Sequence, residues 1–173
     1  YPLTAGAHTL RWAYEKDVSL AKGSDAAWID AVSLPSTGAG TATGHLVVLQ
    51  ADSPPTINGA SGDDTYLLSS YLLAGSEVFT LSDPQGNNRL QLVSGLAIAA
   101  SEVTTTTLRL ILSNGTQLKV NGANVFSYQP CGNAVIGLNP TSVTFASFAL
   151  DTLGVAIPSS GTAIGGAVTI NCL

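Results

Sequence analysis

Charged side chains are scarce in this sequence: Asp, Glu, Lys and Arg make up only 10% of its 173 residues, whereas 45% are hydrophobic. Acids outnumber bases, so the formal net charge is -5 and the isoelectric point is about 4.6. Such a chain offers no basic surface to a phosphate backbone or an anionic lipid, which argues against nucleic acid as a partner. The large apolar fraction argues equally against a disordered, charge-rich tail. The surface must therefore be neutral and rich in hydroxyl groups.

Methionine is absent, and so are long hydrophobic runs. The longest apolar stretches, residues 46–49 and 96–100, are much shorter than the roughly 20 residues that a membrane-spanning helix needs, so we predict no transmembrane segment. Because the chain opens at Tyr1, without an initiator methionine, we expect an N-terminal segment to have been cleaved or left out. These features favour a secreted protein, either extracellular or at the cell surface.

Cysteine occurs only at Cys131 and Cys172, and no CxxC or Cys/His spacing suggests a zinc site. In a secreted chain an even cysteine count favours a disulfide between the two, which would tie the last strand to the middle of the chain. Two free buried thiols are the alternative. On the chain-entropy model a loop of this length stabilises the fold by roughly 4 kcal/mol.

Polar and apolar residues alternate with a period of two in many short segments, which Gly, Pro, Asn and Asp clusters separate. This pattern predicts an all-β fold, specifically an antiparallel β-sandwich or a jelly-roll-like arrangement. The Gly/Ser/Thr-rich residues 36–44 are predicted to be a linker or loop. They separate N-terminal strands in residues 1–35, the end of a larger sandwich or a donor strand, from a main β-domain in residues 45–173. Predicted strands of the main domain cover residues 45–51, 77–81, 89–93, 103–107, 124–128 and 163–172.

The strongest local signal is the pair Asn114-Gly115 between two alternating arms, residues 108–113 and 116–120. Asn-Gly readily supplies the two positive-φ positions of a type I′ turn, so we predict a β-hairpin here. The same residues begin an Asn-Gly-Thr glycosylation acceptor, but the turn explains them fully.

One segment breaks the period-two pattern. Residues 142–153 place Phe145 and Phe148 on one helical stripe, which predicts a short helix packed on the sheet. Thr141 or Ser142 would cap its start and Gly154 its end. An extended apolar strand is the alternative, because this segment also contains β-branched residues.

Acidic and aromatic side chains gather near the N-terminus. The tract Gly6 to Trp12, followed by Lys16-Asp17 and by Gly23 to Asp30, resembles the closing strands of β-sandwich modules in bacterial surface proteins and glycan-binding proteins. Carboxylates that converge beside a strand suit Ca²⁺, although such acids can also cap turns and face water. The aromatics would form a sugar platform or else belong to a core. The candidate ligands are Asp17, Asp25 and Asp30 for Ca²⁺, and Trp12 and Tyr14 for carbohydrate.

A second resemblance begins at residue 57. The sequence Ile57-Asn58-Gly59-Ala60-Ser61-Gly62-Asp63-Asp64-Thr65-Tyr66 resembles one calcium-binding nonapeptide repeat of the large secreted RTX-type adhesins. This resemblance implies Ca²⁺ ligation by Asp63 and Asp64, with a plain Gly-Asp-Asp turn as the alternative. Residues 66–132 also resemble repetitive β-modules of large bacterial adhesins.

Enzyme signatures are few in the sequence, and a carboxylate pair such as Asp25 and Asp30, which could cleave glycosides, is a minor alternative. The two histidines, His8 and His45, lie within or beside predicted strands, and no Gly-x-Ser-x-Gly, HExxH or phosphate-binding loop occurs. We therefore predict a non-enzymatic, self-assembling filament or surface-layer subunit, joined to copies of itself by strand sharing. Its donor strand would come from residues 4–14 or 163–172. The alternative is a calcium-dependent adhesin module that binds carbohydrate or another surface ligand.

Overall fold

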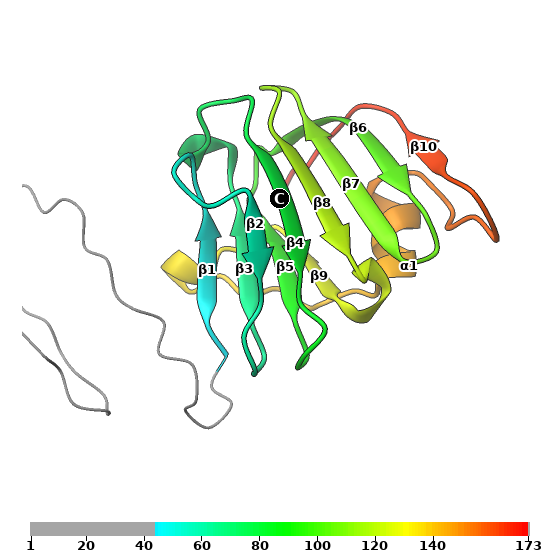
Figure 1. Ribbon diagram of the computed structural model, residues 1–173. Coiled ribbons are helices and arrows are strands. Elements are labelled where there is room, and N and C mark those ends of the chain that lie inside the picture. The colour runs from blue at the N-terminus through cyan, green and yellow to red at the C-terminus, as the bar shows by residue number, and fades with distance from the viewer. Residues whose placement is uncertain (1–43, 173) are drawn as a thin grey trace, which may run out of the picture. The chain divides into compact units, whose positions relative to one another are not determined.

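The computed structural model describes residues 44–172, and two β-sheets dominate this part of the chain (Figure 1). Sheet A is entirely parallel. Its strands, in spatial order, are β1 (Leu46–Leu49), β3 (Thr65–Leu68), β5 (Arg89–Leu92) and β9 (Ser127–Pro130).

Sheet B is mixed, with the spatial order β10-β6-β7-β8-β4-β2 and with β11 also paired to β6. Strands β2, β4 and β8 run parallel to one another, whereas β10, β6, β7 and β8 are antiparallel neighbours. Their bounds are β2 (Thr56–Asn58), β4 (Val78–Ser82), β6 (Ala97–Val103), β7 (Thr107–Leu112), β8 (Gln117–Asn121), β10 (Ala163–Gly165) and β11 (Val168–Thr169).

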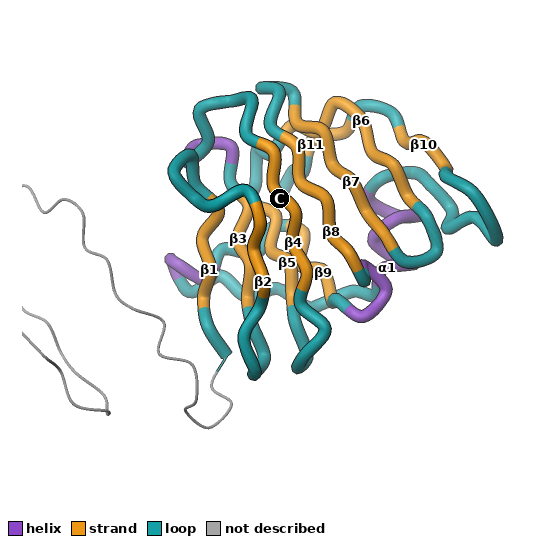
Figure 2. Tube along the Cα trace, viewed as in Figure 1, coloured by secondary structure: helices purple, strands orange, loops and turns teal. Residues whose placement is uncertain are grey.

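The chain builds these sheets by winding between them (Figure 2). It passes from β1 in sheet A to β2 in sheet B, back to β3, across to β4 and back to β5, and each new strand lies parallel to the strand one turn earlier. The β6-β7 hairpin interrupts this path before β8 and β9 complete it. The prediction of an all-β fold is therefore confirmed, but its antiparallel arrangement is wrong for sheet A and for the β2-β4-β8 part of sheet B.

The hydrophobic core lies between the two sheets. Period-two alternation directs every second side chain inward: in β7, Leu108, Leu110 and Leu112 are at most 2% exposed, while the residues between them are half-buried. Sheet A contributes Tyr66, Leu68, Leu90, Leu92 and Tyr128 to the same cluster. Each fully buried Leu or Phe side chain stabilises the fold by about 1.5–3 kcal/mol relative to an exposed one.

The predicted hairpin is present as β7 and β8, but its turn is not type I′. Leu112 accepts a hydrogen bond from Gly115 N at 2.9 Å, and only Gly115 has a positive φ, of 97°, in the connection. Asn114 stays at negative φ, and its side chain accepts from Thr116 N at 3.1 Å. The connection is thus a three-residue loop that ends in a glycine bulge.

The strand predicted over residues 103–107 is a turn. Strand β6 ends at Val103, and Thr104 Oγ1 accepts from the backbone N–H groups of Thr106, at 3.3 Å, and Thr107, at 2.9 Å. A short hydroxyl side chain that bonds nearby backbone in this way competes with strand pairing. The predicted strands 45–51, 77–81, 89–93 and 163–172 correspond to β1, β4, β5 and the β10-β11 segment. The strand predicted over residues 124–128 is wrong in its first half, because η2 covers residues 123–125 and β9 begins only at Ser127.

The predicted short helix is present, as α1 (Phe145–Ser147) followed by a π-helical turn, η4 (Phe148–Thr152). Thr144, not Thr141 or Ser142, caps it by accepting from Ser147 N at 3.2 Å. Gly154 follows it with a left-handed φ of 69°. Three 3₁₀ turns complete the secondary structure between residues 44 and 172: η1 (Ser70–Leu72), η2 (Ala123–Val125) and η3 (Ala134–Ile136).

The structure contains the predicted disulfide between Cys131 and Cys172, whose Cα atoms are 5.8 Å apart. It ties the chain just after β9 to the end of the described residues. The predicted N-terminal strands in residues 1–35, and residues 36–43 of the predicted linker, lie outside the part that the structure describes. No helix within residues 44–172 is long and apolar enough to cross a membrane.

Candidate functional site

The two outer strands of sheet A, β9 and β1, differ in how their outer edges are covered. At the side of β9, the backbone of Tyr128 is paired with Val143: Tyr128 N donates to Val143 O at 2.9 Å, and Val143 N donates to Tyr128 O at 2.8 Å. The α1-η4 helix covers the same side, because Phe148 stacks on Tyr128 with ring centroids 4.5 Å apart. The disulfide holds the chain immediately after β9. The edge of sheet A at β9 is therefore closed.

The opposite side of sheet A ends at β1, whose outer edge is open within the described residues. Thr65 N donates to His45 O at 2.8 Å, and the register of β1 on β3 continues from there. Backbone groups of successive strand residues point to opposite sides, so Val47 and Leu49 pair with β3 while Leu46 and Val48 face away. Leu46 is 44% exposed.

Sheet B ends in the same way at β2. Thr80 N donates to Pro55 O at 2.8 Å and Gly59 N donates to Ser82 O at 3.0 Å, which directs Ile57 toward β4. The backbone groups of Thr56 and Asn58 therefore face away from the sheet. We call the outer edges of β1 and β2 together the open edge: these two strands follow each other in the chain, and each has one side without a partner strand in the described residues.

Sheet B has a second outer edge at β10 and β11. These strands are three and two residues long and pair with β6. Very short edge strands are a common protection against unwanted pairing. Strand β2 is also only three residues long, so β1, with four residues, is the longest strand with an open outer edge in the part of the chain that the structure describes.

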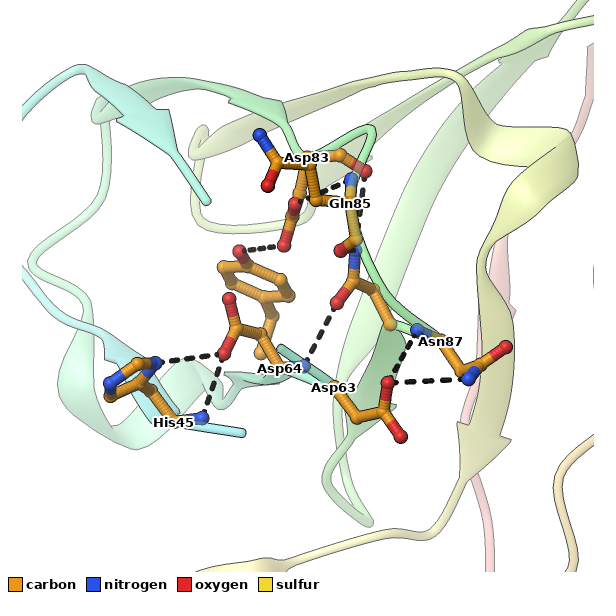
Figure 3. Close-up of polar contacts among 8 residues, drawn as sticks. His45, Asp63, Asp64, Asp83, Gln85 and Asn87 are labelled. Atoms are coloured by element: carbon orange, nitrogen blue, oxygen red, sulfur yellow. Dashed lines mark hydrogen bonds and ion pairs between the residues drawn. The ribbon is translucent and has the colours of Figure 1, made fainter. Parts of the chain in front are cut away.

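A stack of polar turns lies beside the starts of the sheet A strands (Figure 3). The turn of residues 59–64, between β2 and β3, packs on the turn of residues 83–88, between β4 and β5. Asn87 N donates to Asp63 Oδ1 at 2.8 Å, and Asp64 N donates to Asn88 Oδ1 at 2.8 Å. The region that resembles one RTX repeat is therefore stacked on a neighbouring turn, although that turn lacks the Gly-Asp-Asp sequence.

Asp64 and Asp83 are buried carboxylates in this stack. Asp64 is 1% exposed, and its Oδ1 accepts from His45 N at 2.7 Å and lies 3.0 Å from His45 Nδ1. Asp83 is 2% exposed and accepts from the Tyr66 hydroxyl at 2.7 Å. Burial, reinforced by the bond to Asp83 and its negative charge, raises the pKa of Tyr66 far above the usual range for tyrosine, so its hydroxyl stays a donor.

These contacts determine how the carboxylates of Asp63 and Asp64 are placed for binding a metal ion. Asp63 is exposed and turned toward Asn87, whereas Asp64 is buried and turned toward His45, so the two carboxylates serve different partners. No group of three or more His, Cys, Asp or Glu side chains that could hold a metal occurs within residues 44–172. The Ca²⁺ ligands Asp17, Asp25 and Asp30 and the sugar-binding aromatics Trp12 and Tyr14 lie outside the described residues, so these sites stay predictions.

The turn stack depends on glycines that permit close backbone approach. At Gly86, φ is 83° and a Cβ would overlap the carbonyl oxygen of Gly62 in the neighbouring turn. Gly137 has a similar φ, 75°, but nothing lies within 4 Å of its Cβ position. Substituting alanine at each of the two glycines therefore separates the free-energy cost of the left-handed backbone from that of disturbing the stacked turn.

We expect Gly137→Ala to lower the free energy of unfolding by about 1–2 kcal/mol, the cost of a left-handed alanine. Gly86→Ala should lower it by about 3 kcal/mol or more, because the neighbouring backbone must also move. Urea denaturation of both variants measures the difference. Equal losses would show that the turns do not pack as tightly as described.

Sequence reasoning identified the turn at residues 83–88 but missed the roles of His45, Tyr66, Asp83 and Asn88. The only available signal was the cluster of Asp, Pro, Gly and Asn, which predicts a turn and not a buried carboxylate. No protein-family model, no curated protein and no solved structure matches this chain. The open edge and the turn stack are therefore the features of the molecule that indicate a function.

Proposed function

We propose that this chain is a subunit of a secreted cell-surface structural protein, and that its subunits join by strand sharing at the open edge. The observation that carries the proposal is an asymmetry of the sheet edges: the outer edges of β1 and β2 have no partner strand within the described residues, whereas Val143, the α1-η4 helix and the disulfide close the edge of sheet A at β9. An exposed strand edge is a template for pairing with another chain.

The scarcity of charge supports the same function. Lys and Glu side chains usually guard strand edges against pairing, and charged residues make up only 10% of this chain. None of the residues in β1 or β2 is charged, and neither strand contains proline. The disulfide supports an oxidising, extracellular location.

The C-terminal segment is the less suitable of the two candidate donor strands. Strands β10 and β11 pair with β6 of their own chain, and Cys172 is bonded to Cys131, so the C-terminal segment is held in place. We therefore take residues 4–14 as the donor, with Leu10, Trp12 and Tyr14 as the alternating side chains. Head-to-tail donation produces an open polymer, whereas direct pairing of two open edges would stop at a dimer.

Deleting residues 1–14 tests the donor. We expect the shortened protein to keep its melting temperature, since residues 44–172 form their own core, and to lose the polymers that light scattering detects for the intact protein. An intact protein that stays monomeric at high concentration would contradict strand donation. An intact protein that stops at a dimer would replace it with edge-to-edge pairing.

Neighbouring proline variants test the acceptor. In Val48→Pro the lost N–H faces away from β3, so we expect a stable fold that no longer polymerises. Val47→Pro is the matched control, because its lost N–H pairs with β3 and the fold itself should weaken. Unchanged polymerisation of Val48→Pro would show that the edge of β1 is not the acceptor.

The second candidate function is a calcium-dependent adhesin module that binds carbohydrate. The observation that favours it is the stacking of the Asp63-Asp64 turn on the turn of residues 83–88, which is the arrangement that the RTX-like sequence implies. In this alternative the exposed Asp63 carboxylate would be the more accessible ligand.

A further inference from the structure

Two of the three cationic side chains within residues 44–172 stand directly opposite each other on sheet B. These three are Arg89, Arg109 and Lys119, against seven acidic residues in the same part of the chain. Arg109 on β7 is the register partner of Lys119 on β8. Like charges in directly opposed cross-strand positions destabilise a sheet, and Glu102, the register partner of Arg109 on β6, offsets part of this repulsion.

The neighbouring side chains hold Arg109 in a fixed orientation. Its Nη1 donates to Glu102 Oε1 at 2.8 Å, and its Nη2 donates to Gln117 Oε1 at 2.7 Å. Since a guanidinium has five N–H donors, these two bonds leave others for a further acceptor. Lys119 is exposed and forms no ion pair with any residue in the described range.

A shallow hollow of about 360 Å³ lies over this pair. Threonine hydroxyls complete its lining: Thr104 and Thr107, whose Oγ1 atoms are 2.7 Å apart, come from the β6-β7 turn, and the exposed Thr162 precedes β10. The volume falls within the range of small-molecule sites. Its lining combines one unpaired cation, one partly occupied guanidinium, a carboxylate and three hydroxyl groups.

We propose that this hollow, which we call the sheet B hollow, binds a carboxylate-bearing sugar unit of an acidic polysaccharide. Lys119 and the free N–H groups of Arg109 receive the ligand carboxylate, and the planar guanidinium suits a carboxylate better than a point charge does. The threonine hydroxyls receive the ring hydroxyls. The site does not depend on strand sharing, because it lies on the face of sheet B and not at the open edge.

Glu102 gives the proposal a distinctive consequence. Its carboxylate already accepts a hydrogen bond from Arg109 Nη1, so it competes with the carboxylate of the ligand for the guanidinium. Removing the charge at Glu102 should therefore tighten binding, whereas a site that recognises only sugar hydroxyls would lose a hydrogen-bond acceptor and weaken.

The test is calorimetric titration of the intact, disulfide-bonded protein with a short oligogalacturonate at low salt. We expect saturable binding that the fully methyl-esterified oligomer does not show, since esterification removes the charge and keeps the hydroxyl groups. Lys119→Gln should weaken binding at least tenfold, and Glu102→Gln should strengthen it. Arg89→Gln is the matched control, because it removes one positive charge from sheet A and should change the affinity less than twofold.

Three results would overturn the site. They are absence of saturable binding by the unmodified protein, equal binding of the methyl ester, and losses for Arg89→Gln as large as those for Lys119→Gln, which would indicate non-specific attraction to net charge. Melting temperatures of the variants check that each is folded. Lys119 is exposed, so its replacement leaves the core intact.

Discussion

Phe148→Ala is expected to lower the free energy of unfolding by about 3–5 kcal/mol, the usual cost of replacing a buried phenylalanine with alanine. Phe148 is fully buried and stacks on Tyr128 with an interplanar angle of 7°. It anchors the helix that closes the side of β9, so its removal leaves a cavity against the last strand of sheet A. Guanidinium or urea denaturation, followed by fluorescence, measures the loss.

Leu150→Ala is the matched control for Phe148→Ala. Leu150 belongs to the same π-helical turn but is 57% exposed, so its replacement should change the free energy of unfolding by no more than about 0.5 kcal/mol. Similar effects of the two variants would show that the helix does not close this side of the molecule through its aromatic face.

Loss of the disulfide is expected to have a similarly large effect. Cys131 and Cys172 are 41 residues apart in the sequence, for which the chain-entropy model gives a stabilisation of about 4 kcal/mol. The double variant Cys131→Ser and Cys172→Ser should unfold at clearly lower urea concentration than the oxidised protein. Its β10-β11 segment should exchange amide hydrogens faster, because these two short strands depend on the bridge for their position.

Reduced unmodified protein is the control for the serine variant and should match it. Intact mass checks the bond itself: the oxidised protein should resist alkylation and gain two hydrogen atoms on reduction. Alkylation of both thiols before any reductant is added would contradict the disulfide.

The positions of many strands were predictable from the sequence, but their pairing was not. Alternation of polar and apolar residues shows that a segment such as residues 89–93 has one buried face. The same alternation arises whether the neighbouring strands are parallel or antiparallel. The stacked strands of sheet A follow at unequal intervals: pairs of residues that contact across neighbouring turns are 19, 24 and 38 residues apart. Without a constant period, and with the β6-β7 hairpin inserted, the winding of the chain leaves no repeat in the sequence.

The conformation and the contacts of the turns were not predictable for a different reason. Residue preference alone predicts a type I′ turn at Asn114-Gly115. In the structure the hydrogen bond from Gly115 N to Leu112 O belongs to a three-residue loop instead. The burial of Asp64 and Asp83 was not predictable either, because their partners His45 and Tyr66 come from other strands. The candidate site is built from such contacts between turns, which local sequence patterns do not encode.

Amide hydrogen exchange at the open edge tests the central claim most directly. The N–H groups of Leu46 and Val48 on β1 face away from sheet A, so a strand added at this edge must protect them when subunits associate, whereas Thr56 and Asn58 on β2 belong to the other sheet. We predict fast exchange at Leu46 and Val48 in dilute protein, strong protection in concentrated protein, and loss of that protection when residues 1–14 are deleted. Exchange at these two amides that is the same at every protein concentration would contradict assembly through the edge of β1.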